Sequence, residues 1–490
     1  MTDVHDWLAG QSDRVIETSC AWVFLQGERA LKIKQPVDYG FLDFSTAAKR
    51  RWALERELAF NRVTAPQIYR TVRRITRDGG ALALDGGGET IDYALEMRAF
   101  DPAAVLAEQP DVVDGALADQ LGRIIARFQA AAEVRPEGGG VNALGFTIRT
   151  NAANLRALAP KLGAREVEDV IAATDAAFAA AAPLLERRRR GGFARRCHGD
   201  LHLGNILLED GQPVLFDCIE FNDLLSEIDV LYDVAFLIMD LAFRDRPEAA
   251  NRVLNAYLDE AARSFPADLW DGLAALPLML SARASVRTHV TAYQDDLATS
   301  RRYLSTAGRL LSPAPPTLTA IGGLSGTGKT TLARRVAPVL GAAPGAVILR
   351  SDEIRKRLAG VGPLQRLPPE SYTPRSSAEV YDEMLRLARC ILAAGHSVVL
   401  DAVFLSADER TAAETVARES GAPFRGVWLE GARDRLRGRL DARRGDASDA
   451  GPDVLDEQLS RDPGPIDWEK LDAADPDKAA LHITVVNAEA

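Results

Sequence analysis

The sequence has little of what marks secreted, membrane-spanning or nucleic-acid-coating proteins. Its four cysteines are scattered over 490 residues without a C-x-x-C pair, which argues against a disulfide framework or zinc ribbon and favours the cytoplasm. The first residues, MTDVHDWLAG, lack the basic and apolar regions of a signal peptide. The most apolar run, residues 230–243, is too short for a bilayer and contains acids, so it predicts a buried helix and no membrane partner.

An excess of positive charge is also missing. Acids outnumber Lys and Arg by 70 to 59, so the net charge of −11 provides no general attraction to nucleic acid. The run RRRR at 187–190 is interpreted as a solvated helix end, with a nucleic-acid contact as the less favoured alternative. The composition, with 47% hydrophobic and 26% charged residues, is typical of globular domains. The length of 490 residues predicts more than one such domain.

Three prolines in four residues of LSPAPPTLTA place the clearest boundary near residue 314. Upstream, residues 21–34 predict a hairpin around Gly27, and residues 45–63 predict a helix with Ser45 or Thr46 as its N-cap. A second hairpin is predicted at 81–97, turning on the glycine triplet. The expected divisions are a small β-rich lobe at about 19–100, a helical lobe at about 101–311, a linker at 312–316 and a second domain at 317–490.

The second domain alternates apolar β-like runs with helical stretches. This alternation predicts an α/β domain with a parallel sheet wrapped by helices. The predicted strands are TLTAIGG, AVILRSD, SVVLDAV, FRGVWLE and HITVV.

Residues 323–330 spell GLSGTGKT, a complete G-x-x-x-x-G-K-[ST] phosphate-binding loop between a predicted strand and a predicted helix. Its backbone N–H groups are expected to surround a polyphosphate, with Lys329 on the β- and γ-phosphates and the Thr330 hydroxyl on Mg²⁺. The predicted nucleotide-binding residues are Gly323, Ser325, Gly326, Thr327, Gly328, Lys329, Thr330 and Thr331.

Polar residues follow two strands of this predicted sheet. Ligands of open α/β sheets lie beyond the carboxyl ends of the strands, so Asp352 is expected beside the phosphate loop as the base for an attacking hydroxyl. Arg355 is expected to hold an anionic acceptor or a phosphoryl group, and Asp401 to hold Mg²⁺ or its water. Three arginines at four-residue spacing predict either a lid that closes on phosphate or a plain salt-bridged helix: Arg435, Arg439 and Arg443.

The combination of GLSGTGKT, SDEIRKRL, VVLDAVF and R-x-x-x-R…DASDA resembles the P-loop kinases grouped with zeta toxins and polynucleotide 5′-kinase domains. The resemblance covers nearly all of 317–490. It implies that Asp352 activates the acceptor hydroxyl, that Arg355 helps hold the acceptor, and that Arg435 or Arg439 steadies the transition state. The acceptor varies across this group and does not carry over.

A second motif, HGDLHLGN, occupies residues 198–205. Its Asp and Asn have the spacing of a kinase catalytic loop, so Asp200 is the expected acceptor base and Asn205 a Mg²⁺ ligand. Asp217, after a short predicted hairpin, completes the expected metal site. The alternative is a zinc site made by His198, Asp200 and His202, which the Asn and the later Asp disfavour.

This loop resembles the signature of the aminoglycoside phosphotransferase family, and the likeness extends over about residues 20–305. It implies a two-lobed α+β kinase-like fold in which Lys32, with Lys34 as rival, contacts ATP. The implied ion-pair partner is Glu57, with Glu55 as the alternative, and Asp233 is implied to brace the loop. The chain departs from the family in having ETSCAWVFL where a glycine-rich phosphate loop is expected, so an inactive first domain remains an alternative.

The resulting expectation is a cytoplasmic, bifunctional ATP- and Mg²⁺-dependent phosphotransferase. Each domain is expected to transfer a γ-phosphoryl group to a hydroxyl of a small metabolite such as a sugar, amino sugar or related alcohol. The alternatives for the P-loop domain are a polynucleotide 5′-OH kinase and a nucleotide-driven switch for the first domain. The sequence predicts neither acceptor and no oligomeric state.

Overall fold

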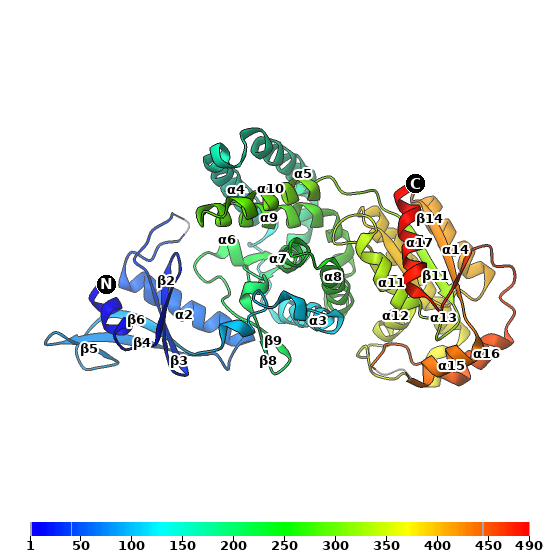
Figure 1. Cartoon of the computed structure of the whole chain (residues 1–490), viewed down its shortest axis with the longest axis horizontal. Coiled ribbons are helices and arrows are strands. Elements are labelled where there is room, and N and C mark those ends of the chain that lie inside the picture. The colour runs from blue at the N-terminus through cyan, green and yellow to red at the C-terminus, as the bar shows by residue number, and fades with distance from the viewer. Residues whose placement is uncertain (1, 41, 443–444, 490) are drawn as a thin grey trace. The chain divides into compact units, whose positions relative to one another are not determined.

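The structure is a computed structural model that describes residues 2–40, 42–442 and 445–489 (Figure 1). Its contacts divide the chain into two compact units. The first unit comprises Met1–Val113, Ala131–Thr147 and Glu186–Asp240. The second comprises Asp114–Ala130, Ile148–Leu185 and Leu241–Ala490, so it includes residues from both sides of the proline-rich segment.

A six-stranded antiparallel sheet dominates the first unit, in the order β1-β2-β3-β6-β4-β5. Its strands are β1 (Arg14–Glu17), β2 (Ala21–Gln26), β3 (Arg29–Lys34), β4 (Tyr69–Asp78), β5 (Ala81–Leu84) and β6 (Glu89–Arg98). β2 and β3 form the predicted hairpin around Gly27. The helix α2 (Ala47–Thr64) packs against β4 and β6, and its N-cap is Thr46, whose side chain accepts the Lys49 N–H.

The glycine triplet at 86–88 does not make the predicted hairpin turn. β5 pairs with β4 through Gly79 and Gly80, whose φ angles are 54° and 95°, and β6 returns along the other side of β4. The prediction was wrong because this tighter two-glycine turn already pairs the short β5 with β4. The triplet instead passes close to β4: a Cβ on Gly88 would lie 2.1 Å from the carbonyl oxygen of Arg77.

Short β segments surround the second motif in the first unit. β7 (Ala194–Arg196) pairs with β10 (Glu227–Asp229), and β8 (Ile206–Glu209) forms a hairpin with β9 (Gln212–Leu215). The arginine run ends the helix α5 (Ala164–Arg190) as predicted, but Arg188 is only 1% exposed and its Nε lies 2.7 Å from Asp229 Oδ2. The interpretation of the whole run as a solvated helix end was therefore wrong for Arg188.

Helices dominate residues 111–310, as predicted, and the apolar run 230–243 is the buried helix α7 (Val230–Phe243). In the part of the chain that the structure describes, no helix combines the length and the apolar character needed to cross a bilayer. The other helices before the proline-rich segment are α1 (Thr2–Ala9), α3 (Gly115–Ala131), α4 (Gly140–Leu162), α6 (Asp223–Ser226), α8 (Pro247–Ala261), α9 (Leu276–Tyr293) and α10 (Leu297–Leu310).

The second unit contains a five-stranded parallel sheet in the order β12-β13-β11-β14-β15. Its strands are β11 (Leu318–Gly323), β12 (Val347–Arg350), β13 (Val398–Asp401), β14 (Phe424–Glu430) and β15 (Glu469–Asp472). The helices between and after them are α11 (Lys329–Val336), α12 (Ser351–Leu358), α13 (Pro374–Ala393), α14 (Ala407–Glu419), α15 (Arg433–Ala442), α16 (Pro452–Ser460) and α17 (Pro476–Glu489). This arrangement confirms the predicted α/β class.

The fifth strand is not the one predicted. HITVV lies in α17, and the edge strand is β15, which pairs with β14. β-branched residues favour strands, but tertiary packing overrides that preference where a helix covers a sheet. Ile483, fully buried in α17, joins the core under the sheet, and α17 packs beside α11.

This core holds the ends of the strands that carry the motifs. Ile321, Leu332, Val336, Val399 and Val427 are fully buried in one cluster. Burial of each such side chain contributes about 1.5–3 kcal/mol. The cluster therefore fixes the carboxyl ends of β11 and β13, from which the phosphate loop and Asp401 project.

Candidate active sites

In the first unit, two lysines of β3 converge on one carboxylate of α2. Glu57 has no solvent exposure; its Oε1 lies 2.7 Å from Lys32 Nζ and its Oε2 lies 2.7 Å from Lys34 Nζ. Glu55, the alternative partner, instead pairs with Arg51 on the surface of the helix. The structure thus brings both candidate lysines to Glu57.

The two lysines differ in their second partners. Lys32 Nζ lies 2.8 Å from Asp217 Oδ1, whereas Lys34 Nζ lies 2.6 Å from Glu220 Oε1. Burial lowers the pKa of Lys32, but the carboxylates of Asp217 and Glu57 outweigh it, so the pKa is well above its usual value. Burial likewise raises the pKa of Asp217, yet the ammonium of Lys32 lowers it overall. The ammonium and the carboxylate therefore keep each other ionised.

Glu220 was not singled out in the sequence. It is 4% exposed and compensates Lys34, so the cluster contains two cations and three anions. The period-two spacing of the lysines in ALKIK, which places both on one face of a strand, indicated that Lys34 would need a partner. The position of that partner, 186 residues later, is a property of the fold.

The loop 198–205 brings Asp200 and Asn205 together. The side-chain Nδ2 of Asn205 donates to Asp200 Oδ2 at 2.8 Å and to the Asp200 carbonyl at 2.9 Å. This orientation uses the amide nitrogen within the loop. The amide oxygen of Asn205 and the carboxylate of Asp217 are hard oxygen donors of the kind that Mg²⁺ prefers.

Asp233 braces this loop, as the resemblance implied. Its carboxylate accepts the backbone N–H of His198 at 3.2 Å and that of Gly199 at 2.8 Å, and it is fully buried. Two N–H donors on one carboxylate hold the turn at Gly199, where φ is 85°.

The histidines of the loop bond to protein atoms. His198 Nε2 lies 2.9 Å from the Phe216 carbonyl, and His202 Nδ1 accepts the N–H of Gly204 at 3.0 Å. Burial lowers the pKa of His198, so its ring is neutral. Among the described residues, no group of three His, Cys, Asp or Glu side chains is arranged to hold a metal ion, and the zinc alternative finds no support.

In the second unit, the phosphate loop depends on glycine at two positions. Gly326 and Gly328 have φ angles of 86° and 90°. A Cβ on Gly326 would lie 2.7 Å from the carbonyl oxygen of Leu436. Lys329 begins α11, and its Nζ lies 2.8 Å from the Gly323 carbonyl and 3.1 Å from that of Leu324. The loop is a cradle without room for side chains, which fits a polyphosphate.

A second segment contacts the start of this loop. The Oε1 of Gln458 accepts the backbone N–H of Ser325 at 2.8 Å, and its Nε2 donates to Ser325 Oγ at 3.1 Å. The hydroxyl of Thr327 donates to the Leu324 carbonyl at 2.8 Å, which stabilises the turn. Gln458 lies in α16 and was not singled out in the sequence.

Thr330 and Asp401 meet because β11 and β13 are parallel neighbours, with Ile321 opposite Asp401. The Thr330 hydroxyl donates to Asp401 Oδ2 at 2.6 Å. A hydroxyl and a carboxylate beside a phosphate cradle form a donor set that fits Mg²⁺. Arg350 Nε lies 3.4 Å from the same carboxylate oxygen, and the sequence analysis did not include this arginine.

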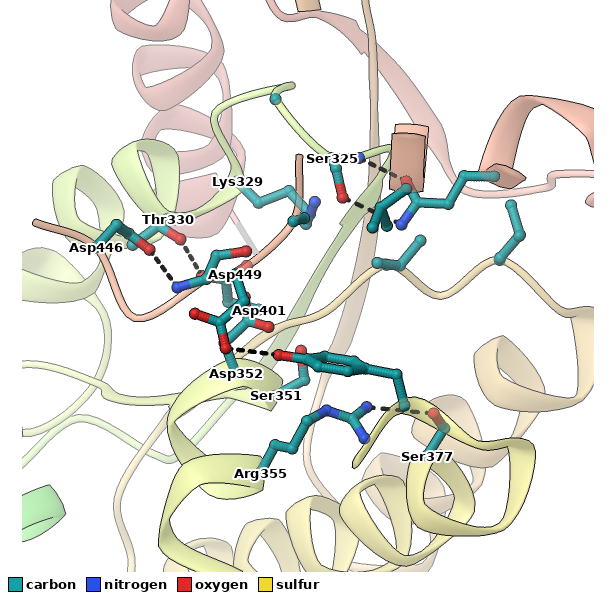
Figure 2. Close-up of a pocket in the computed structure, with 18 of the residues that line it drawn as sticks. Ser325, Lys329, Thr330, Ser351, Asp352, Arg355, Ser377, Asp401, Asp446 and Asp449 are labelled. Carbon is teal, nitrogen blue, oxygen red and sulfur yellow. Dashed lines mark hydrogen bonds between the residues drawn. The ribbon is translucent and has the colours of Figure 1, made fainter. Parts of the chain in front are cut away.

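Thr330 and Asp401 line one cavity, of about 1040 Å³, together with Asp352 and Arg355 from α12. Figure 2 shows these four side chains in a close-up of the cavity. Arg355 is already engaged: it donates to the Ser371 carbonyl at 2.8 Å and to Ser377 Oγ at 3.2 Å, and its guanidinium stacks 4.9 Å from the Tyr372 ring. The structure thus places Asp352 in the same cavity as the phosphate loop. Through its bonds to Ser371 and Ser377, Arg355 holds part of the cavity wall in place.

Asp449 connects three parts of that wall. Its carboxylate accepts from Tyr372 Oη at 2.7 Å, from the Leu367 N–H at 3.0 Å and from Lys356 Nζ at 3.1 Å. Burial raises the pKa of Asp449, but these three donors lower it overall. The acidic segment DASDA therefore closes the cavity.

The arginines predicted to form a lid have different surroundings in the structure. Arg439 lines the cavity, with Nη1 3.4 Å from the Gly326 carbonyl and 3.3 Å from that of Thr327. Arg435 is exposed, 3.9 Å from Asp472, and is not among the residues lining that cavity. Arg443 lies outside the described residues. Arg439 alone is beside the phosphate loop in the described part of α15.

Comparisons with known proteins bear on both sites. Residues 44–276 match the model of the "Phosphotransferase enzyme family", and residues 318–464 match the "AAA domain" model. The uncharacterized protein Rv2004c of Mycobacterium tuberculosis is 31% identical over 476 residues, which cover 94% of this chain and 92% of that protein. The uncharacterized protein Mb2027c of Mycobacterium bovis matches to the same extent. The chain belongs to the same family as these two proteins.

This chain joins a segment that matches the phosphotransferase family to a segment that matches the AAA domain model, and it is an ATP-dependent kinase. Solved structures with local likeness include a sugar kinase from Janibacter sp. HTCC2649, at 20% identity and a TM-score of 0.26, covering 35% of this chain and 94% of that one. A microcompartment-associated aminopropanol kinase has 18% identity and a TM-score of 0.39, covering 64% of this chain and 97% of that one.

Proposed function

We propose that the protein is a bifunctional phosphotransferase with two separate ATP- and Mg²⁺-dependent sites, each acting on a hydroxyl of a small metabolite. The first domain is assigned to residues 1–311 and the second to 317–490, joined by 312–316. The observation that carries the proposal is the single cavity that contains Lys329, Asp352 and Asp401. It combines a phosphate cradle, a carboxylate for the acceptor and an oxygen donor for a cation.

In the P-loop site, Asp352 accepts the proton of the acceptor hydroxyl as its oxygen bonds to the γ-phosphorus of ATP. The bond from the γ-phosphorus to the β–γ bridging oxygen breaks, and ADP leaves with that oxygen. Lys329 and Arg439 stabilise the negative charge on the transferring phosphoryl group. Thr330 and Asp401 would hold Mg²⁺, which would supply positive charge to neutralise the phosphates. Arg355 keeps the wall at Ser371 and Ser377 in place around the acceptor.

In the first site, Asp200 accepts the acceptor proton, and Asn205 and Asp217 hold the metal with their oxygens. Lys32, positioned by Glu57, contacts the phosphates. The turn that replaces a glycine-rich loop is closed by Thr18, whose N–H and Oγ bond to the Ala21 carbonyl at 2.9 and 3.0 Å. The intact pairing of Lys32 with Glu57 and Asp217 supports an active first domain over an inactive one.

The charge around the P-loop cavity supports a small acceptor over a polynucleotide end. The cavity lining lacks the excess of positive charge that binding of a polyanion requires. Six carboxylates, Asp352, Asp401, Glu409, Asp446, Asp449 and Glu457, stand against five basic side chains, Lys329, Arg355, Arg366, Arg439 and Arg461. The four scattered cysteines are all free, which supports the cytoplasm as the compartment.

The test is a phosphoryl-transfer screen with γ-labelled ATP against sugars, amino sugars, other small alcohols, nucleosides and RNA 5′ ends. Wild type is compared with Asp200→Asn and Asp352→Asn, each of which removes one proposed base. Each substitution should lower transfer to one class of acceptor by about 10²- to 10⁴-fold and leave the other class unchanged.

Transfer that survives both substitutions would contradict the two-site proposal. Label on RNA ends that depends on Asp352 would favour the polynucleotide kinase. The switch hypothesis predicts that Asp352→Asn leaves all transfer intact while nucleotide binding at the P-loop persists.

A further inference from the structure

Helix α8 covers an open edge of the parallel sheet within the second unit. β12 is an edge strand that pairs only with β13, and edge strands expose unpaired N–H and C=O groups. Asn251 Nδ2 donates to the carbonyls of Pro344 at 3.2 Å and Ala346 at 3.0 Å. Asn255, one turn later, accepts the N–H of Ile348 at 2.7 Å. The two asparagines supply the partners that another strand would supply.

One further turn along α8, Asp259 meets three arginines. It is 5% exposed, and its oxygens lie 2.9 Å from Arg123 Nη1, 3.2 Å from Arg357 Nη1 and 3.7 Å from Arg263 Nη2. Arg357 belongs to α12, the helix that also carries Asp352. A single buried carboxylate thus joins α8 to α12.

The ion pairs continue from there to the P-loop site. Arg123 Nη2 lies 4.0 Å from Glu353 Oε1, which in turn lies 2.9 Å from Arg350 Nη1. Arg350 Nη2 lies 2.9 Å from Asp446 Oδ1, and its Nε lies 3.4 Å from Asp401 Oδ2. Arg350, 5% exposed, therefore connects the acid beside Thr330 to the acidic segment that closes the cavity.

We propose that α8 is a positioning element of the P-loop site, which acts through Asn251, Asn255 and Asp259 on β12 and α12. The proposal rests on the proposed function, because it takes Asp352 and Asp401 to be working residues. All three positioning residues lie within 44–276, the segment that matches the phosphotransferase family. The second kinase site thus depends on residues that the first domain contributes from before the linker.

The ion pairs of Asp259 are expected to affect the P-loop site because they are buried. Removing one partner of a buried ion pair leaves an uncompensated charge, whereas exposed pairs contribute little. Without the charge of Asp259, the guanidinium groups of Arg123, Arg263 and Arg357 would repel one another beside the last turn of α12. The helix would shift, and with it Asp352 and the contacts of Arg350.

Hydrogen–deuterium exchange on the full-length protein tests the contact without relying on catalysis. Asp259→Asn is compared with Glu248→Gln, which removes an exposed carboxylate from the same helix. Amides of 347–358 should exchange at least about tenfold faster in Asp259→Asn and at the wild-type rate in the control. Equal exchange in the two variants would overturn the proposal.

A second measurement separates positioning from simple support of the fold. Asp259→Asn should keep the wild-type affinity for a fluorescent ATP analogue, because it leaves the phosphate loop intact. It should lower phosphoryl transfer from the P-loop site at least about tenfold. Asp259→Glu, which retains the charge, should recover part of that loss. Wild-type transfer by Asp259→Asn would overturn the positioning role.

Two outcomes keep the inference distinct from the proposed function. If wild type transfers no phosphoryl group to any acceptor, the proposed function fails while the exchange result still decides the contact. If Asp259→Asn does not fold, Asn255→Ala replaces it, because it removes the partner of the Ile348 N–H and the bonds of Asn255 to Ala346 and Asn251 while leaving the ion pairs of Asp259 in place. Unchanged exchange at 347–350 in that variant would contradict the role of α8.

Discussion

Lys32 and Lys329 hold corresponding places in the two proposed sites, yet their ammonium groups have different partners. Lys32 lies within 2.8 Å of two carboxylates, Glu57 and Asp217. Lys329 contacts two backbone carbonyls of its own loop. The first site therefore neutralises its cation with carboxylates of the protein, whereas the cation of the second site is proposed to contact the phosphates of a ligand.

Because of this difference, we expect Lys32 to contribute mainly to the stability of the fold and Lys329 mainly to ligand binding. A charge compensated inside the fold contributes to the folded state before any ligand arrives, and its loss exposes the partner that remains. A charge directed at a ligand contributes mainly when the ligand is bound. The two lysines are thus a matched pair for measuring each contribution.

The largest expected effect comes from Lys32→Met and Lys329→Met. Lys32→Met leaves two carboxylates without this cation and should lower the free energy of unfolding by about 3–5 kcal/mol. Lys329→Met should change stability little but weaken ATP binding at the P-loop at least about a hundredfold. Chemical denaturation and a fluorescent-nucleotide titration measure the two effects. Equal loss of stability in both variants would contradict the comparison.

A second test of the comparison uses the phosphate loop, because its shape depends on the backbone conformation of its glycines. Gly326→Ala puts a methyl group 2.7 Å from the Leu436 carbonyl at a φ of 86° and should weaken nucleotide binding about a hundredfold. Gly438→Ala is the control, since a Cβ there meets nothing within 4 Å. If both variants bind ATP equally well, the cradle is not as tight as described.

Lowering the pH sharpens the comparison, because the cluster of Lys32, Lys34, Glu57, Asp217 and Glu220 contains no histidine, whereas the second unit holds His289 in a partly buried position. Burial lowers the pKa of His289 to about 4 from 6.5. Between these values the unfolded chain binds a proton that the folded chain does not, so stability falls as the pH falls. From pH 7 to pH 5, wild type should lose about 2 kcal/mol more than His289→Gln in denaturant titrations. Equal losses would indicate an accessible ring.

The smallest effect is expected at an exposed ion pair. Arg375 and Glu379 lie one turn apart in α13, with Nε and Oε1 3.2 Å apart and both side chains largely exposed. Arg375→Gln should lower the unfolding temperature by less than about 1 °C, because solvent already screens the pair. A calorimetric shift as large as that of Lys32→Met would show that burial is not what distinguishes the cluster around Glu57.

The P-loop site was easier to predict from sequence because its residues are nearly contiguous. The eight residues 323–330 carry the phosphate loop and Thr330, and a parallel sheet brings Asp401 to the same edge. The loop 198–205 could be predicted for the same reason, and Lys32 and Glu57 followed from the resemblance. Their ion pair is now observed, although the catalytic roles of these residues stay predictions.

The sequence analysis did not predict the features that depend on packing between residues far apart in the chain. HITVV has the composition of a strand, but burial of Ile483 beneath the sheet makes it part of a helix. The hairpin at the glycine triplet failed because β5 pairs with β4 instead. Glu220 and Arg350 carry no local signal, since each is defined by a partner 186 or 96 residues away. The fold determines which distant residue compensates a buried charge, and the spacing of residues in the sequence does not predict it.

The asparagines of α8 also bear on the order in which the chain is made. During synthesis, β12 follows Asn255 by roughly ninety residues, or about 5–20 s at typical rates of translation. Its strand neighbour β13 emerges later still, and β11, although earlier, is not adjacent to it. Of the elements made before it, α8 and α11 contact β12, and α8 supplies the hydrogen bonds to its open edge. A helix made before the linker can serve as the template on which the second domain begins its sheet.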